Sequence, residues 1–277
     1  MLGMVAVRGA ASEPAKEDGA VVLTLATLNL WNDKGDWPKR ERQIVRTLRE
    51  LHPDVITLQE VIQHDGLPNQ AETIARALGY HYVFSSVDPA DKPQRFGNAI
   101  LTRHRILAEG WKKLMPLDDY RTIAHVRIAI GQRSVNVYTT HLHWTEAGGA
   151  IRATQVADVL DYIAATSEGL PSILAGDLNA SMDAPELRLL EAPFFDAYAT
   201  MHPDAKPDDR AHSTLNLNQY TPKHIDQVLL QRDSFIPTEA KVILDKPDAD
   251  GIWPSDHYGV LVRFRTVSAG VAPGNTN

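Results

Sequence analysis

The chain has 277 residues, of which 43% are hydrophobic and 23% are charged, the composition of an ordinary soluble globular protein. Its formal net charge of -7 argues against a surface built for unspecific adhesion to nucleic acid, although a nucleic-acid substrate bridged by metal ions is not excluded. Cysteine is absent, which excludes disulfides, zinc–thiolate sites and thiol nucleophiles and leaves the compartment open, cytoplasmic or exported.

The two ends of the chain differ in composition from the part between them. Residues 1–20 are rich in Gly and Ala but lack a basic n-region and an apolar h-region, so we expect a loose tail rather than a complete signal peptide. Residues 268–277 are rich in Gly, Ala, Pro and Asn and predict a second tail. No apolar run approaches the length of a membrane span, and no linker divides the middle. We therefore expect a single domain at 21–267, without integral membrane association.

The first half of the domain alternates strands and helices. Helix signals are clear, since Pro38 suits a helix start, Pro53 stops that helix and Gly79 suits the cap of the next one. The predicted strands are Val21–Leu30, Asp54–Glu60, Tyr82–Ser86 and Asn98–Thr102, and the predicted helices are Pro38–Leu51 and Ala71–Leu78.

In the second half several strands follow one another before a long helix. The further predicted strands are Arg121–Ile130, Ser134–Thr140, a buried strand beginning at Ser172 and ending at Gly176, Ile225–Gln231 and Tyr258–Phe264; the helices are Gly149–Ala165 and a short one near Pro185. This order predicts an α/β (α+β) fold, in which two mixed β-sheets pack together with helices outside.

Polar residues gather where the predicted strands end. They are carboxylates, carboxamides and imidazoles without thiols, a hard-ligand set suited to Mg²⁺ or Mn²⁺ rather than zinc: Asn29, Glu60, His141, Asp177, Asn179, Asp226, Asp256 and His257. If the strands share two stacked sheets, these ends can converge on one rim. Magnesium usually takes one or two carboxylates and several waters, so Glu60 with one further ligand is enough to bind the ion.

Each polar residue also has a purely structural interpretation. Asp177 and Asn179, two positions apart, could hold a water beside a phosphate oxygen, or could form an ordinary turn. Asn29 could be a turn former, and Glu60 an exposed strand end. A purely structural interpretation fits Asp226 less well, because a carboxylate at the edge of a buried strand needs a partner.

Six motifs in order resemble the endonuclease/exonuclease/phosphatase superfamily, whose fold is DNase I-like, a four-layer sandwich of two sheets flanked by helices. They span nearly the whole domain and read TLNLW around Asn29, TLQEV around Glu60, YTTHLHW around His141, AGDLNA around Asp177, KHIDQVLL around Asp226 and PSDHYGV around Asp256 and His257. One such motif carries little weight alone, but six in the family's order make chance agreement improbable.

The resemblance implies a magnesium site, with manganese as a possible substitute. Glu60 resembles the principal metal ligand, and Asn29 resembles the residue beside it that binds the metal or its water. Asp256 matches a residue that contacts a second metal.

The resemblance also implies catalytic roles. Asp177 matches the carboxylate that positions and activates the attacking water, and Asn179 the amide that helps to hold water and phosphate. Asp226 resembles the acid that orients His257, whose protonated ring would stabilise the pentacoordinate phosphorane or transfer a proton. His141 matches a phosphate-contacting histidine that is a proposed general acid in some family members.

Two further residue sets have competing interpretations. Arg121 resembles an arginine near the phosphate in many bacterial family members, or is a solvated cation at a strand end. His141 and His143 form an H-x-H pair that could belong to a zinc site, but Trp144, Thr145 and Glu146 follow instead of further ligands. For His143 and Trp144 we expect a place on the cleft wall or packed on the loop.

The sequence as a whole predicts a Mg²⁺-dependent phosphodiesterase that hydrolyses a P–O bond by in-line attack of an activated water. Alternatives are a phosphomonoesterase on a small phosphorylated metabolite, a nuclease on single-stranded nucleic acid, and a catalytically silent binding protein. The expected partner is a phosphoester substrate, with nucleic acid only as substrate, and the expected oligomeric state is a monomer. A Cys-Asp-Arg element typical of the inositol-phosphatase branch is missing, which disfavours that substrate class.

Overall fold

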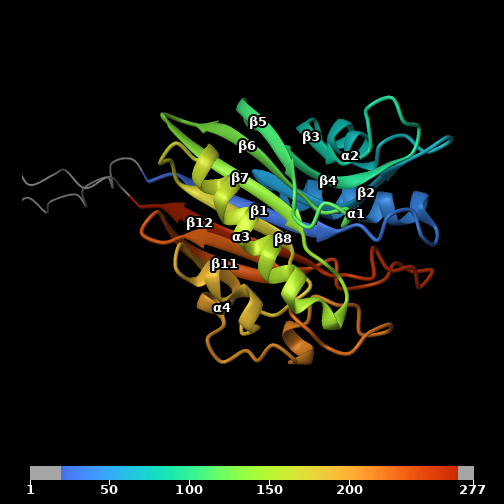
Figure 1. The fold of residues 1–277 in the computed structure, drawn as a ribbon. Coiled ribbons are helices and arrows are strands. Elements are labelled where there is room, and N and C mark those ends of the chain that lie inside the picture. The colour runs from blue at the N-terminus through green and yellow to red at the C-terminus, as the bar shows by residue number, and fades with distance from the viewer. Residues whose placement is uncertain (1–19, 268–277) are drawn as a thin grey trace, which may run out of the picture.

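The computed structural model describes residues 20–267, and the predicted tails at 1–20 and 268–277, apart from Ala20, lie outside the described residues (Figure 1). Its described part contains two six-stranded mixed sheets. The first sheet has the spatial order β11 (Phe235–Ile243), β12 (Gly259–Thr266), β1 (Val22–Asn29), β2 (Val55–Gln63), β4 (Arg95–Thr102) and β3 (His81–Ser86). The second has the order β5 (Ile106–Lys113), β6 (Thr122–Ile130), β7 (Arg133–His141), β8 (Ser172–Asp177), β10 (Asp226–Gln231) and β9 (Phe194–Asp196).

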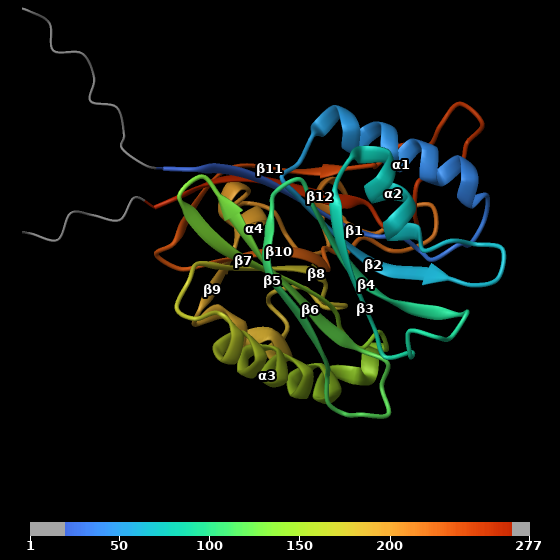
Figure 2. The same ribbon diagram turned by 90° about the horizontal axis from the view of Figure 1, so that it is seen from above.

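Three helices cover the two outer faces: α1 (Trp37–Leu51), α2 (Gln70–Leu78) and α3 (Gly149–Thr166). A fourth, α4 (Ala197–Met201), contacts β9, β10 and β11, and its Ala197 and Tyr198 join the core between the sheets. The short 3₁₀ segments are η1 (Glu146–Gly148), η2 (Pro185–Glu191) and η3 (Arg210–His212). Figure 2 shows α1 and α2 on one side of the strands and α3 on the other. The predicted fold class, two packed mixed sheets flanked by helices, is confirmed.

The core between the sheets follows from the alternation of apolar residues along the strands. On β6, Ala124, Val126, Ile128 and Ile130 enter this core, while His125 on the other face stacks on Tyr138 with a centroid distance of 4.5 Å. Each sheet contains one parallel pair, β1 with β2 and β7 with β8, joined across α1 and α3 respectively. Within residues 20–267 no helix is both long and apolar enough to cross a membrane.

A buried carboxylate, Asp54, ties the start of β2 to neighbouring segments. Its side chain accepts hydrogen bonds from the Thr24 backbone N–H (2.8 Å) and Arg103 Nε (3.0 Å), and His104 Nε2 lies 2.7 Å from it. Burial by itself would raise the pKa of Asp54, but the hydrogen bonds from His104, Thr24 and Arg103 outweigh it and hold that pKa below its usual value.

We expect Asp54→Asn to lower the free energy of unfolding by about 1.5–3 kcal/mol at pH 7, because three donors then face an amide instead of a carboxylate. Since the folded-state pKa is depressed, this contribution is present above the ordinary pKa of about 4 and is lost as the pH falls through the folded-state pKa. Urea denaturation at pH 7 and below pH 4 measures the difference. The exposed Asp91→Asn variant is the control, and a difference that persists undiminished in acid would contradict the assignment.

Candidate active site

The inward faces of four strands end in polar side chains at one edge of the sandwich. Alternate residues of these strands form the core between the sheets, such as Leu25 on β1 and Val228 on β10. The same alternation brings the first or last residue of each strand to this inter-sheet space: Asn29 (β1), His141 (β7), Asp177 (β8) and Asp226 (β10). Because Asp177 pairs in register with both His141 and Asp226, the folding of the second sheet alone brings three of the predicted residues together.

Asp177 lies at the centre of this group and is fully buried. Its Oδ2 accepts a hydrogen bond from Asn29 Nδ2 of the opposite sheet (3.0 Å) and lies 3.3 Å from His141 Nε2 and 3.9 Å from His257 Nε2. Its Oδ1 accepts from the Asn179 backbone N–H (2.8 Å). Burial and the charge of Asp226 raise the pKa of Asp177 above its usual value, so this carboxylate is poised to take a proton.

The backbone on either side of Asp177 is unusual. Gly176 has a φ of +145°, and a Cβ atom there would overlap the Thr140 carbonyl oxygen, so only glycine allows β7 and β8 to approach this closely. Asn179 has a φ of +51°, and its Nδ2 donates to the Leu142 carbonyl oxygen (2.9 Å). The turn after β8 is therefore fixed by its own hydrogen bonds, with Asn179 on the cleft wall.

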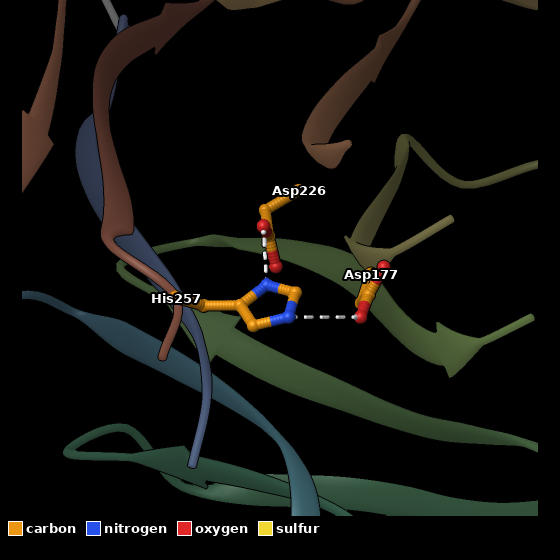
Figure 3. A group of neighbouring side chains, drawn as sticks. All are labelled: Asp177, Asp226 and His257. Carbon is orange, nitrogen blue, oxygen red and sulfur yellow. Dashed lines mark hydrogen bonds and ion pairs between the residues drawn. The ribbon is translucent and has the colours of Figure 1, made fainter. Parts of the chain in front are cut away.

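Asp226 and His257 form a buried carboxylate–imidazole pair (Figure 3). The ring of His257 lies between two carboxylates, with Nδ1 donating to Asp226 Oδ2 (2.9 Å) and Nε2 facing Asp177. Burial alone would lower the pKa of His257, but the charges of Asp226, Asp177 and Asp256 and the hydrogen bond to Asp226 raise it to about 10. The ring is accordingly an imidazolium at neutral pH, with both nitrogens protonated.

His141 has the opposite protonation state. Burial, with the nearby charges of Arg121 and His257, lowers its pKa well below the usual value, so the ring is neutral, and its Nδ1 has no hydrogen-bond partner among the described residues. Arg121 is also buried on the cleft wall, 3.8 Å from Asp119. Its Nε, the atom 3.8 Å from Asp119, is buried and makes no hydrogen bond within the described part, which argues against the interpretation as a solvated cation.

Glu60 reaches the cleft in a different way from the prediction. The strand does not end at Glu60 but continues to Gln63, with a bulge between Leu58 and Val61, and Glu60 in that bulge has a φ of +54°. Simple alternation would turn Glu60 to the outer face, where Leu58 packs under the helices. The bulge instead aims the carboxylate into the cleft, where Oε2 accepts from Asn32 Nδ2 (3.1 Å).

Asp256 precedes β12 at the same rim. Its Oδ1 accepts from the Ser255 hydroxyl (3.3 Å) and its Oδ2 from the Tyr220 hydroxyl (3.1 Å), while the Ser255 hydroxyl also donates to the Asn29 carbonyl oxygen (2.7 Å). Asp256 and Asn29 are therefore held in one hydrogen-bonded unit.

The donor set of the cleft suits a hard divalent cation. Asp177, Asp226 and His257 form a group of ligand atoms within 4.8 Å of one another, in which His257 Nδ1 is already hydrogen-bonded to Asp226 Oδ2 (2.9 Å). Glu60 and Asp256 supply carboxylate oxygens that line the same cleft, whereas Asn29 Oδ1 accepts from the Trp31 backbone N–H (2.9 Å). Oxygen ligands of this kind fit Mg²⁺ or Mn²⁺ better than zinc.

Most of these groups border one cleft of about 960 Å³, while Asn29 and Asp226 lie behind its wall and contact Asp177 and His257, which line it. Its wall carries three exposed aromatic side chains: Trp144, which is 68% exposed, Tyr120 at 64% and Tyr220 at 45%. The expected place of Trp144 on the cleft wall is confirmed. His143 does not have the geometry of a zinc ligand, because its Nδ1 lies 2.8 Å from Asp119 and its Nε2 lies 2.8 Å from Thr145.

The sequence analysis missed two residues that support the site. Asn32 contacts Glu60, and Tyr220 contacts Asp256. Asn32 lies only three positions after Asn29, and this short spacing was the one available signal; Tyr220 lies in a long loop, and no pattern in the sequence singled it out.

Comparison with known proteins identifies a family and several relatives. Residues 26–257 match the Endonuclease/Exonuclease/phosphatase family. Tyrosyl-DNA phosphodiesterase 2 of Gallus gallus is 25% identical over 261 residues, 87% of this chain and 67% of that protein. A putative neutral sphingomyelinase of Caenorhabditis elegans is 23% identical over 293 residues, 87% of this chain and 66% of that protein. The chain thus spans about two thirds of the length of both relatives.

A solved structure shows the same fold. The crystal structure of D. rerio TDP2 complexed with single strand DNA product has a TM-score of 0.73 and 19% identity, covering 88% of this chain and 98% of that chain. The family match extends over nearly all of the described sandwich and includes every predicted site residue from Asn29 to His257. The chain therefore belongs to the endonuclease/exonuclease/phosphatase family and is a hydrolase that acts on phosphoester bonds.

Proposed function

We propose that the chain is a Mg²⁺-dependent phosphodiesterase that hydrolyses a P–O bond by in-line attack of water. The observation that carries this proposal is the arrangement around Asp177: a buried carboxylate with a raised pKa lies 3.3 Å from a neutral imidazole and 3.9 Å from an imidazolium. A proton acceptor beside a fixed positive charge, in an open cleft, suits deprotonation of a water next to an anionic phosphorus centre.

The proposed roles follow from the protonation states. Asp177 orients the attacking water and accepts its proton, while Asn179 helps to hold water and phosphate. His257, kept charged by Asp226, stabilises the negative charge that develops on the phosphoryl oxygens. His141 contacts the phosphate through its neutral ring.

Arg121 is proposed to bind the phosphate as well. Its buried guanidinium lines the cleft, and Nε makes no hydrogen bond among the described residues, with Asp119 3.8 Å away, so an anionic oxygen would give it a hydrogen-bond acceptor.

Glu60, Asn29 and Asp256 are proposed to hold the metal. The bulged backbone of Glu60 supports this, because strained conformations persist at functional positions. A bound Mg²⁺ would supply Lewis-acid stabilisation of charge at the phosphoryl group and the leaving oxygen.

The test is turnover of bis(p-nitrophenyl) phosphate by the purified chain with Mg²⁺ or Mn²⁺, with and without EDTA. We expect metal-dependent release of p-nitrophenol that the Asp177→Ala variant lacks. Absence of metal-dependent turnover of any phosphoester would overturn the proposal and favour the catalytically silent binding protein.

Glu60→Gln is expected to weaken metal binding more than it lowers the maximal rate. The amide keeps the shape but loses the charge that attracts the cation, so the Mg²⁺ concentration for half-maximal activity should rise about tenfold or more. Activity is expected to recover partly at high Mg²⁺. Measuring turnover against Mg²⁺ concentration tests this role of Glu60. A loss of activity that high Mg²⁺ cannot restore would show that Glu60 is not a metal ligand.

A nuclease acting on single-stranded nucleic acid is the second candidate. The exposed rings of Trp144, Tyr120 and Tyr220 on the cleft wall favour it, since bases stack on such rings. Relatives named tyrosyl-DNA phosphodiesterase and sphingomyelinase differ in substrate, so a panel of candidate substrates is needed to identify the one that this chain hydrolyses. Single-stranded DNA and RNA, sphingomyelin, glycerophosphodiesters and phosphorylated sugars separate this candidate from a lipid phosphodiesterase and from a phosphomonoesterase.

We further propose that residues 21–267 form one domain that acts as a monomer. Support for the single domain comes from the topology, in which the late strand β12 pairs with the first strand β1.

A further inference from the structure

A buried cation, Arg40 of α1, lies between two loops beside the catalytic cleft. The first loop, at 30–34, follows β1, and the second loop, at 252–256, leads toward β12. The side chain of Arg40 is fully buried, with 0% exposure. Within residues 20–267 each hydrogen bond of its guanidinium ends on a backbone carbonyl oxygen and none on a carboxylate. A buried charge is costly unless it is hydrogen-bonded, so these carbonyls hold the guanidinium in one position.

The carbonyls that bind Arg40 belong to both loops. In the first loop, Nη1 donates to the carbonyl oxygens of Asn32 (3.2 Å) and Lys34 (2.6 Å), and Nη2 donates to that of Leu30. In the second loop, Nε donates to the carbonyl oxygen of Pro254 (2.9 Å). The guanidinium is planar and its donors have a fixed geometry. One rigid group therefore joins two loops that are more than 200 residues apart in the chain.

Each loop leads to one of the proposed metal ligands. Asn32 of the first loop donates from Nδ2 to Glu60 Oε2 (3.1 Å), while its own carbonyl accepts from Arg40. Asp256 of the second loop follows Pro254 by two residues. Both carboxylates line the catalytic cleft. The position of one carboxylate relative to the other thus depends on a group that binds both loops.

Other contacts hold the same loops against α1. Gln43, almost one helical turn after Arg40, donates from Nε2 to the Ile252 carbonyl oxygen (3.0 Å) of the second loop. The ring of Trp31 in the first loop lies over the Arg40 guanidinium, with 5.1 Å between its centroid and Cζ, and also lines the cleft. The inner face of α1 therefore supports both loops, with the guanidinium between them.

Arg40 keeps its charge in this position. Burial lowers the pKa of the guanidinium to about 10, although the charges of Asp256, Asp33 and Glu60 act in the opposite direction. At neutral pH the side chain is therefore protonated, and all its N–H donors are present.

We propose that Arg40 is a positioning residue, whose guanidinium fixes the two loops relative to each other and thereby sets the separation of the Glu60 and Asp256 carboxylates for a divalent cation. Magnesium demands near-ideal geometry at short ligand distances, so a small displacement of either loop would weaken its binding. Arg40 acts only through the loops and contacts neither metal nor substrate. The inference rests on the proposed function, because it takes these carboxylates as metal ligands.

Arg40→Lys tests the proposal, because it keeps the positive charge but offers three N–H donors from one nitrogen to four carbonyls. Electron paramagnetic resonance of Mn²⁺ in the presence of the full chain measures binding without any turnover. Urea denaturation establishes a temperature at which the variant is folded. We expect the folded variant to bind Mn²⁺ about tenfold more weakly or less tightly still, as for other groups that orient metal ligands. Unchanged Mn²⁺ affinity would overturn the proposal and leave Arg40 a purely structural role.

Arg127→Lys is the matched control. Arg127 of β6 is also mostly buried and joins separate segments, since Nε donates to Asn136 Oδ1 (3.1 Å) and Nη2 to the Thr166 carbonyl oxygen (2.9 Å), but it does not line the cleft. This variant should lower the free energy of unfolding and leave the Mn²⁺ affinity within about twofold, because distant sites without shared partners act independently. Equal weakening of Mn²⁺ binding in both variants would overturn the proposal, since general destabilisation would then explain it.

The unmodified chain gives a second readout if Arg40→Lys does not fold. The Nε–H proton of Arg40 binds the Pro254 carbonyl oxygen, so its NMR resonance should shift when Mg²⁺ is added and the second loop adjusts to the ion. The Nε–H resonance of Arg127 should stay in place. An Arg40 resonance that does not move at saturating Mg²⁺ would overturn the proposal.

Failure of the proposed function gives a different result from failure of this inference. If the unmodified chain binds no Mn²⁺, the proposed metal site is wrong and the positioning role of Arg40 is wrong with it. If the unmodified chain binds Mn²⁺ and Arg40→Lys binds it equally well, the metal site stands and only the role of Arg40 is wrong.

Discussion

Asp177→Asn is expected to lower kcat on a phosphodiester by about 10²–10⁴-fold, the range typical for removal of a general base. The amide can still accept from the Asn179 backbone N–H, so the turn after β8 should persist. It cannot take a proton from water, and its own N–H₂ group would face the donors of Asn29 and His141. Steady-state kinetics on bis(p-nitrophenyl) phosphate, with the folded state checked by circular dichroism, measure the effect.

The matched control is Asp161→Asn, the same substitution at an exposed position of α3 away from the cleft. It should change kcat by less than about threefold, as expected for a surface substitution. Turnover of Asp177→Asn within tenfold of the unmodified chain would show that Asp177 is not the base.

Asp226→Asn is expected to lower kcat by about 10²–10³-fold while changing the Mg²⁺ requirement little. Asp226 is the main source of the charge that keeps the His257 ring protonated, with a pKa of about 10. Without that carboxylate the pKa of His257 falls, so the imidazolium is lost at lower pH and stabilises the transition state less. The basic limb of the pH profile of kcat should therefore move toward neutral pH.

The measurement is kcat against pH from about 6 to 10, together with the Mg²⁺ dependence at one pH. The contrast with Glu60→Gln is informative, because that variant should change the Mg²⁺ dependence first. If Asp226→Asn weakens the Mg²⁺ dependence as strongly as it lowers kcat, Asp226 is a metal ligand rather than the partner of His257.

The strands that the sequence analysis missed are all at sheet edges. They are β5, β9 and β11, the outermost strands of their sheets. An edge strand needs less apolar character because one side faces solvent, and β11 even contains Pro237, which a central strand would not tolerate. Local pattern therefore identified the central strands and the edge strand β3, and overlooked the other three edge strands. The short helix α4 was missed as well, since five residues give too little periodicity to detect.

The amino-acid sequence by itself determined the two-sheet class, the central strands and the set of polar residues at their ends. It could do so because alternation along a strand is a local property: the pattern that buries Leu25 and Val228 also turns Asn29 and Asp226 inward. The opposed protonation states of His141 and His257 were not accessible in this way, because they depend on charges from strands far apart in the chain.

Glu60 shows most clearly what the local sequence could not predict. Its motif identified it as a metal-ligand candidate, yet the alternation of β2 would turn it away from the cleft. Only the pairing of β2 with β4 creates the bulge that reverses its direction, and that pairing joins segments about 40 residues apart. Tertiary structure decided this feature because the direction of the Glu60 side chain is fixed by contacts that the local sequence does not contain.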